Sequence, residues 1–64
     1  MTVKSDLKKA VAAAMAAKGS YLTAAESTQD PSAKNKYEEM AMDADKHVEF
    51  LNSRIQYLTD NTLL

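Results

Sequence analysis

The 64-residue sequence contains no cysteine and no tryptophan, and it has only one glycine and one proline. The lack of cysteine excludes disulfides, zinc knuckles, iron–sulfur ligation and thiol chemistry within the chain. The scarcity of glycine and proline argues against an all-β fold, which needs turn residues about every 8–12 positions. The residues that dominate instead are Ala, Lys, Glu, Leu and Met, and all of these favour helix.

The chain also lacks an excess of charge and a long apolar run. Eight Lys and Arg face nine Asp and Glu, a net charge of −1, so nucleic acid is not an expected partner. No segment approaches the roughly 20 apolar residues of a transmembrane helix. The alanine run Ala12–Ala17 lacks the leucines of a signal-peptide core, and Lys18 follows it directly. We therefore expect a soluble protein that is made inside a cell and is not secreted by a classical signal peptide.

Two segments of helical spacing flank a single break. The first runs from about Val3 to Ser27, with Thr2 as the expected N-cap and Ser5-Asp6 as the alternative. Its periodic apolar residues are Leu7, Val11, Ala14, Met15, Tyr21, Leu22 and Ala25. A turn over about 28–30 ends with Asp30 as N-cap and Pro31 at the first position of a helix that runs to about Thr59. The predicted fold is all-α, a single domain of residues 1–64 that forms an antiparallel two-helix hairpin.

The second segment carries an unbroken heptad pattern typical of a coiled coil. Its seam consists of Tyr37, Ala41, Ala44, Val48, Leu51, Ile55 and Leu58. Met40, Phe50 and Tyr57 lie beside this seam and make the apolar face too wide for one neighbouring helix. We therefore expect a homo-oligomer, most simply a dimer that forms a four-helix bundle. The predicted oligomer interface consists of Met40, Ala44, Val48, Phe50, Leu51, Ile55, Tyr57 and Leu58.

Small residues follow one stripe of the first segment. Ala10, Ala17 and Ala24 repeat every seven positions, which suits close packing against the larger side chains of the second segment. Alternatively, these alanines only support helix propensity. Gly19 indicates either a close contact or a slight bend.

The candidate chemical groups are few. Glu39, Asp43 and His47 are spaced by four, so one helical stripe holds three metal-ligand types. The Glu-x-x-His pair of di-iron bundles is absent, because Ala44 stands three residues before His47. We expect no metal, no cofactor and no catalytic residue, with a metal- or small-ligand-binding four-helix dimer as the alternative. A single histidine and no serine-centred motif give no support for an enzyme.

Charged residues suggest where partners bind. We expect His47 and Arg54 to pair with Glu26 or Asp30 near the turn, or with a second subunit. Three amino-terminal lysines and the acidic stretch 38–49 favour docking between oppositely charged ends, while an anionic membrane surface is a weaker alternative for the lysines. These lysines are Lys4, Lys8 and Lys9. The apolar Leu63-Leu64 tail either caps the bundle or frays.

One collinear set of residues resembles a known family over nearly the whole chain. The first part of the set is Met1-Thr2-Val3, Thr28-Gln29-Asp30, Ala33-Lys34 and Tyr37. The second part is Val48, Leu51, Arg54-Ile55-Gln56 and Leu58. The chain thereby resembles domain of unknown function 1657, a family of small proteins from endospore-forming bacteria. It departs from the family pattern at Ser53, where a proline is expected, and in the tail 61–64, where an acidic, proline-containing end is expected.

The resemblance implies a setting but no activity. It implies expression during sporulation and a place in the cytoplasm or in the forespore or spore interior. It also implies an accessory or structural role beside a spore membrane-associated protein, and it carries over no functional residues. The expected function is that of a non-enzymatic helical assembly or adaptor protein.

Overall fold

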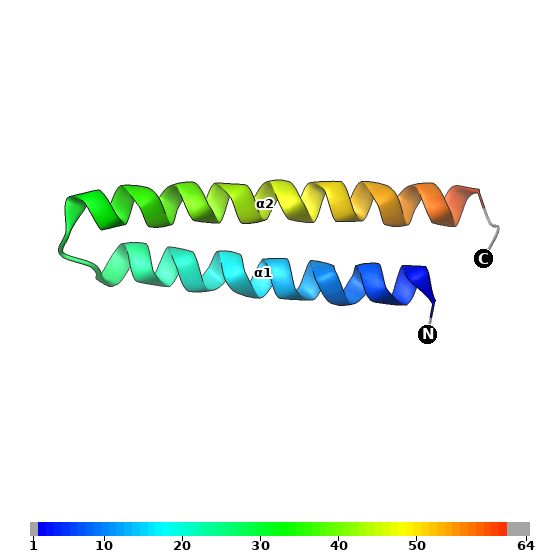
Figure 1. Ribbon diagram of the computed structural model, residues 1–64, viewed down its shortest axis with the longest axis horizontal. Coiled ribbons are helices and arrows are strands. Elements are labelled where there is room, and N and C mark those ends of the chain that lie inside the picture. Colours follow the sequence, from blue (N-terminus) through cyan, green and yellow to red (C-terminus); the bar gives the residue numbers. More distant parts are fainter. Residues whose placement is uncertain (1, 62–64) are drawn as a thin grey trace.

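The computed structural model describes residues 2–61 and consists of two helices joined by a short turn (Figure 1). Helix α1 spans Val3–Ser27 and helix α2 spans Pro31–Asp60, one residue beyond the expected end at Thr59. The helices lie antiparallel and side by side in a rod of 49 × 17 × 10 Å. No strand occurs in residues 2–61, so the predicted all-helical hairpin is confirmed. Leu63 and Leu64 lie outside the described residues.

Side chains cap the start of each helix. The Thr2 hydroxyl accepts a hydrogen bond from the backbone N–H of Ser5 at 3.0 Å, and the Asp30 carboxylate accepts one from the N–H of Ser32 at 3.0 Å. Pro31 takes the first position of α2, where its missing N–H costs nothing. Each cap contributes about 1 kcal/mol to helix stability. The sequence thus determines where both helices begin.

The turn is closed by two bonds at Thr28. Its backbone N–H donates to the carbonyl oxygen of Ala24 at 3.0 Å, which ends α1. Its hydroxyl accepts a hydrogen bond from the backbone N–H of Asp30 at 3.2 Å. The chain therefore reverses within three residues, and the two helices are forced to be neighbours.

The two helices meet along matching heptad seams. Every residue of the α2 seam predicted from the sequence is buried or half-buried. The α1 seam has the same spacing of four and three, and its members are Leu7, Val11, Ala14, Lys18, Tyr21 and Ala25. Met15 and Leu22 belong to the same periodic apolar set of α1, but they are 59% and 43% exposed. Each lies one residue past a seam position, so the helical twist carries it to one side of the contact.

The core of the single hairpin is small. Among residues 2–61, only Ala25, Ala41 and Ala44 are fully buried, and each is at most 4% exposed. The hairpin exposes 4785 Å² of surface, whereas a compact globular protein of its mass exposes about 4,000 Å². The excess surface area follows from the rod shape, because each helix contacts one neighbour and the rest of its surface is exposed.

Gly19 has no close neighbour in the hairpin. A Cβ atom built on it would meet nothing within 4 Å outside its own helix backbone. The expectation of a close contact at this glycine is therefore wrong within one hairpin. Glycine inside a helix costs about 1 kcal/mol relative to alanine, and the packing of the two helices gives no return for that cost.

Gly19→Ala is therefore expected to stabilise the protein by about 1 kcal/mol, which raises the melting temperature by roughly 5 °C. Thermal unfolding followed by circular dichroism measures the shift. Ala16→Gly is the reciprocal control, because Ala16 is exposed on the same surface of α1, and it should lower the melting temperature by a similar amount. A destabilising Gly19→Ala would mean that another molecule packs against this glycine in solution.

Candidate interaction surface

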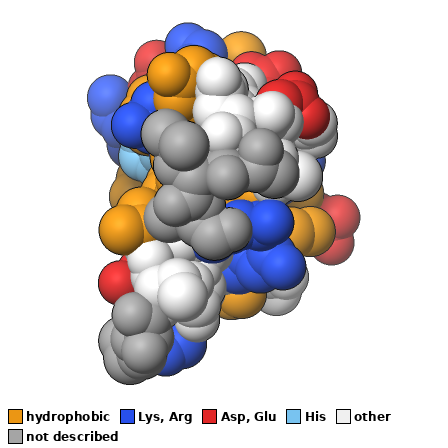
Figure 2. All heavy atoms as spheres, turned by 90° about the vertical axis from the view of Figure 1, so that its right-hand side faces the viewer, with side chains coloured by type: hydrophobic (Ala, Val, Ile, Leu, Met, Phe, Trp, Pro, Cys, Tyr) orange, Lys and Arg blue, Asp and Glu red, His pale blue; other side chains and the backbone are white. Residues whose placement is uncertain are grey.

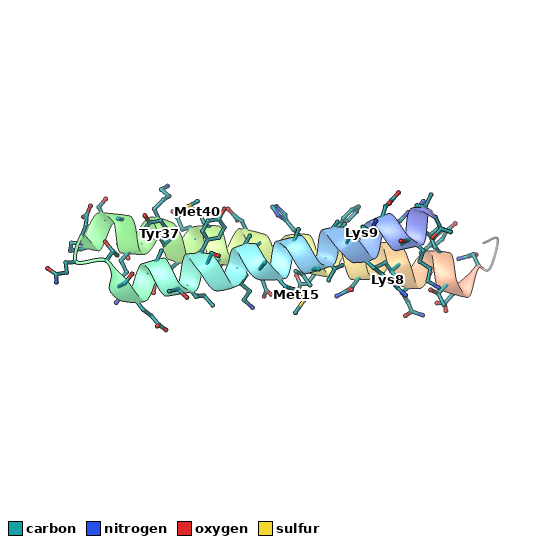
Figure 3. All side chains as sticks on the ribbon, turned by 90° about the horizontal axis from the view of Figure 1, so that it is seen from below. Lys8, Lys9, Met15, Tyr37 and Met40 are labelled. Atoms are coloured by element: carbon teal, nitrogen blue, oxygen red, sulfur yellow. The ribbon has the colours of Figure 1, made fainter. Side chains whose placement is uncertain are left out.

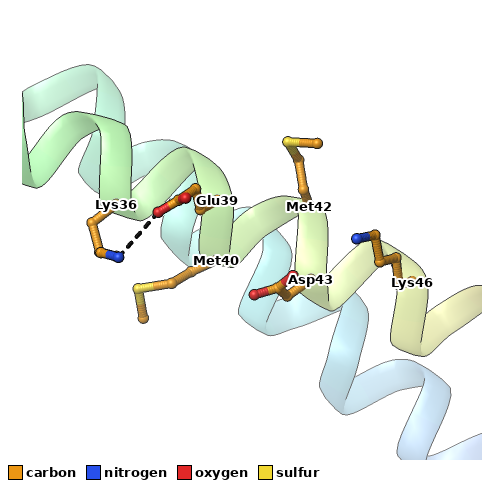
Figure 4. A pocket seen from close by; sticks show the side chains of 6 residues that line it. All are labelled: Lys36, Glu39, Met40, Met42, Asp43 and Lys46. Carbon is orange, nitrogen blue, oxygen red and sulfur yellow. Dashed lines mark ion pairs between the residues drawn. The ribbon is translucent and has the colours of Figure 1, made fainter.

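The two sides of the seam form different surfaces, which we call the Met40 face and the Met42 face. Seen from the α1 side of the rod, Met40 and Met15 lie along opposite edges of the hairpin (Figure 3). Met40 and Met42 likewise point away from each other on α2 (Figure 4). Figure 2 shows apolar side chains reaching the surface between charged ones at the end of the rod where α1 begins and α2 ends. The hairpin therefore carries apolar groups on both sides, and their chemical surroundings distinguish the two faces.

On the Met40 face, α2 carries a row of side chains next to the seam, which we call the flank stripe. Its members are Met40, Asp43, His47, Phe50, Arg54 and Tyr57. Phe50 is 66% exposed and Tyr57 is 54% exposed, although aromatic side chains gain the most from burial. Two large rings thus stand on the surface, one turn apart from a histidine and an arginine.

The α1 side of the Met40 face consists mostly of alanines, with Tyr21 as a larger member. Ala14, Ala17 and Tyr21 line a shallow hollow of about 260 Å³ together with Met40, Asp43, Ala44 and His47 of α2. The predicted stripe of Ala10, Ala17 and Ala24 is half-buried along this side of the seam. Because alanine side chains are short, they project little from the axis of α1, and another helix can approach it closely here.

Arg54 and His47 do not pair with the acids near the turn. The guanidinium carbon of Arg54 lies 4.9 Å from the centre of the Tyr57 ring, a cation–π contact within one helix. His47 lies beside Ala14 and Ala17. It is 17 residues from Asp30 along α2, which is about 25 Å at 1.5 Å per residue. The prediction of ion pairs with Glu26 or Asp30 is therefore wrong, since those acids stand at the end of the rod where the chain turns.

The Met42 face is held by an ion pair between the helices. The Lys18 ammonium lies 3.0 Å from the Asp45 carboxylate, and both side chains are more than one third exposed. A pair of this kind contributes at most about 1 kcal/mol. Leu22, Glu38, Ala41 and Met42 line the surface around it. The sequence pattern gave no sign of this pair, because Lys18 occupies a seam position where an apolar residue was expected.

The acidic stripe predicted as a weak metal candidate lies on open helix surface. Glu39, Asp43 and His47 are all exposed, and the Glu39 carboxylate pairs with the Lys36 ammonium at 3.1 Å (Figure 4). Figure 4 shows the hollow beside it, which α2 forms alone from Lys36, Glu39, Met40, Met42, Asp43 and Lys46. Within the part of the chain that the structure describes, no three His, Cys, Asp or Glu side chains are grouped to hold a metal ion.

The predicted interface residues fall into two sets. Ala44, Val48, Leu51, Ile55 and Leu58 already contact α1 along the seam and are buried or half-buried. Met40, Phe50 and Tyr57 point out of the hairpin on the Met40 face. The sequence analysis did not identify Met15 and Met42 as surface groups, although each lies one step from the seam on its other side.

A family model described as "Protein of unknown function (DUF1657)" matches residues 7–55. The chain belongs to this family. The match covers most of both helices, and therefore most of the contact between them. Comparison with curated proteins found no match, and neither did comparison with solved structures. In residues 2–61 neither helix is long and apolar enough to cross a bilayer.

We predict that Glu39, Asp43 and His47 do not act as a metal site. Titration calorimetry with Fe²⁺, Zn²⁺ and Mn²⁺ should give no stoichiometric binding, and His47→Ala should leave the result unchanged. The physical reason is that a metal ion would lose part of its hydration shell on binding, while three exposed side chains on one straight helix offer it few ligands in return. Glu49→Ala serves as the control, because it removes an exposed acid outside the stripe. Stoichiometric binding that His47→Ala abolishes and Glu49→Ala preserves would contradict the prediction.

Proposed function

We propose that the chain is a non-enzymatic assembly or adaptor protein whose working form is a homodimer of two hairpins packed as a four-helix bundle. One observation supports this above the others: large apolar side chains, including Phe50 and Tyr57, lie on the surface, while three alanines form the fully buried core of residues 2–61. Burying a large apolar side chain contributes about 1.5–3 kcal/mol. A second hairpin that covers Phe50 and Tyr57 supplies stability that a single hairpin lacks.

The Met40 face suits a second copy better than the Met42 face. On the Met42 face, α2 presents Glu38 and Asp45, and Glu49 follows Met42 by one heptad. Two copies that met there through α2 would bring acids together, and like charges across an interface repel. The Met40 face carries Asp43 together with Arg54 and His47, so its charges are mixed. Its small α1 surface also lets the second hairpin approach closely.

We assign no catalytic residue and no cofactor to the chain. The hollows on both faces are shallow surface features lined by residues of one or two straight helices. A two-helix rod has no position from which side chains converge on a substrate from several directions, as catalytic sites require. The face itself is therefore the functional element that we propose.

The proposed dimer predicts that two substitutions at similarly exposed side chains affect dimerisation differently. Phe50 and Met42 are 66% and 64% exposed, on the Met40 face and the Met42 face respectively. Phe50→Glu is expected to dissociate the dimer and reduce helix content, because it removes the burial of the ring and takes a carboxylate out of water. Met42→Glu adds the same charge and should leave the dimer intact. Sedimentation velocity at tens of micromolar and circular dichroism measure both effects.

Two results would contradict this proposal. A folded, cooperative wild-type monomer of 7.0 kDa would mean that the apolar face serves a different protein. Dissociation by Met42→Glu combined with an intact Phe50→Glu dimer would move the interface to the opposite face. Tyr57→Glu provides a second test of the Met40 face, since Tyr57 lies two turns along the same stripe.

The cellular setting we propose is sporulation, and it follows from the family resemblance alone. The chain is expected to accumulate in sporulating cells, in the forespore or spore interior, beside a spore membrane-associated protein. An epitope-tagged copy followed by immunoblot through growth and sporulation tests this expectation. Equal amounts in growing and sporulating cells would contradict the sporulation role, while the dimer is tested separately by sedimentation.

A further inference from the structure

The flank stripe of α2 is complementary to itself when read in reverse. Its six residues are spaced by three and four in an order that is the same in both directions. If two copies of α2 run antiparallel and cross between Val48 and Glu49, Asp43 of each copy lies opposite Arg54 of the other. The same register places Met40 opposite Tyr57 and His47 opposite Phe50. An acid then lies opposite a base, a methionine lies opposite a tyrosine ring, and an imidazole lies opposite a phenyl ring.

We propose that the dimer forms through an antiparallel contact between the two flank stripes, with its two-fold axis passing between Val48 and Glu49. This inference rests on the proposed homodimer and specifies its partner surface, direction and register. The occupant of the Met40 face is a second copy of the same chain, because a two-fold contact requires a surface that complements itself. The flank stripe meets this requirement through its charges and its apolar groups together.

The charges select this direction over the parallel one. A parallel, in-register contact would place Asp43 against Asp43 and Arg54 against Arg54, and such like-charge contacts suppress an arrangement. The antiparallel contact forms two Asp43–Arg54 pairs by symmetry. Lys36, one step further along the same side of α2, falls opposite the uncharged Asn61. No like charges therefore meet along the stripe in this register.

The structure leaves both charged groups available for the contact. Asp43 and Arg54 are exposed, and the described residues contain no ion pair within the hairpin that involves either of them. Arg54 stacks on Tyr57, and this fixes the guanidinium on the Met40 face, where a second copy would approach. The α1 helices meet alongside through Ala10, Ala13 and Ala17, which carry no charge and little bulk.

The competing arrangement turns one hairpin about an axis parallel to the helices. The flank stripe of one copy would then lie on α1 of the other, and the same level along the rod would bring Arg54 near Asp6. Large side chains would meet small ones there, so packing alone does not decide between the arrangements. The arginine partner does decide, since it is Asp43 in the first arrangement and Asp6 in the second.

Charge exchange between Asp43 and Arg54 tests the register. Asp43→Arg and Arg54→Asp should each weaken the homodimer at least about tenfold, because each places two like charges opposite each other. An equimolar mixture of the two variants should form a heterodimer of nearly wild-type strength, because every contact then joins opposite charges. The double variant D43R/R54D should restore the homodimer. Sedimentation equilibrium measures all four dissociation constants, and circular dichroism confirms that each chain is helical.

The controls separate the register from its alternatives. Glu49→Arg makes the same change of charge outside the stripe and should leave dimerisation unchanged. Arg54→Gln removes the cation–π contact without adding a like charge and should weaken the dimer less than Arg54→Asp does.

Three results would overturn the register. The first is a mixture of the two single variants that stays dissociated. The second is an unweakened dimer of Asp43→Arg. The third is a dimer that Asp6→Arg weakens and that Asp6→Arg combined with Arg54→Asp restores. A monomeric wild-type chain would instead overturn the dimer itself, so the two failures are distinguishable.

Discussion

Each helix of the hairpin has one neighbour, and it can therefore bury only one stripe of its surface. Two straight helices in contact enclose a narrow strip, and here the centre of that strip is made of alanines. Alanine brings the helix axes close together but buries little apolar area per residue. The burial that would normally come from leucine and phenylalanine is consequently left for a surface outside the hairpin. The elongated shape, the exposed rings and the shallowness of the hollows along residues 2–61 all follow from this limit.

The turn aligns the two helices but buries little apolar surface. Thr28 and Asp30 satisfy backbone groups at the point where the chain reverses, and Pro31 fixes the start of α2. Because three residues span the reversal, the turn limits which residues of the two helices can face each other. The Lys18–Asp45 pair then joins the helices near the middle of the rod. A hairpin that is correctly aligned but only weakly buried is well prepared to associate with another molecule.

The sequence predicted the fold well because local signals determine most of it. The sequence alone predicts the N-caps Thr2 and Asp30, the break before Pro31 and the heptad seam of α2. The composition of the α1 seam was less legible, since Met15 and Leu22 are more apolar than Lys18, which occupies the seam position between them. Lysine can do so because its aliphatic stem lies along the contact while its ammonium reaches Asp45 at the surface. The expected pairing of Arg54 with Glu26 or Asp30 was wrong for a related reason. Whether those acids can reach Arg54 depends on distance along the rod, and the charge pattern alone does not give that distance.

The position of the chain ends has a geometric consequence. Val3 and Asp60, where α1 begins and α2 ends, lie at the same end of a rod 49 Å long, and the turn lies at the other end. Two rods joined antiparallel form a bar with a pair of chain ends at each extremity, whereas two rods joined side by side in the same direction carry all four ends together. Anything attached to the chain ends is held apart by about the length of the bar in the first case and is gathered at one point in the second. In the proposed dimer, the direction of one helix contact thus decides whether the chain ends are held apart or gathered together.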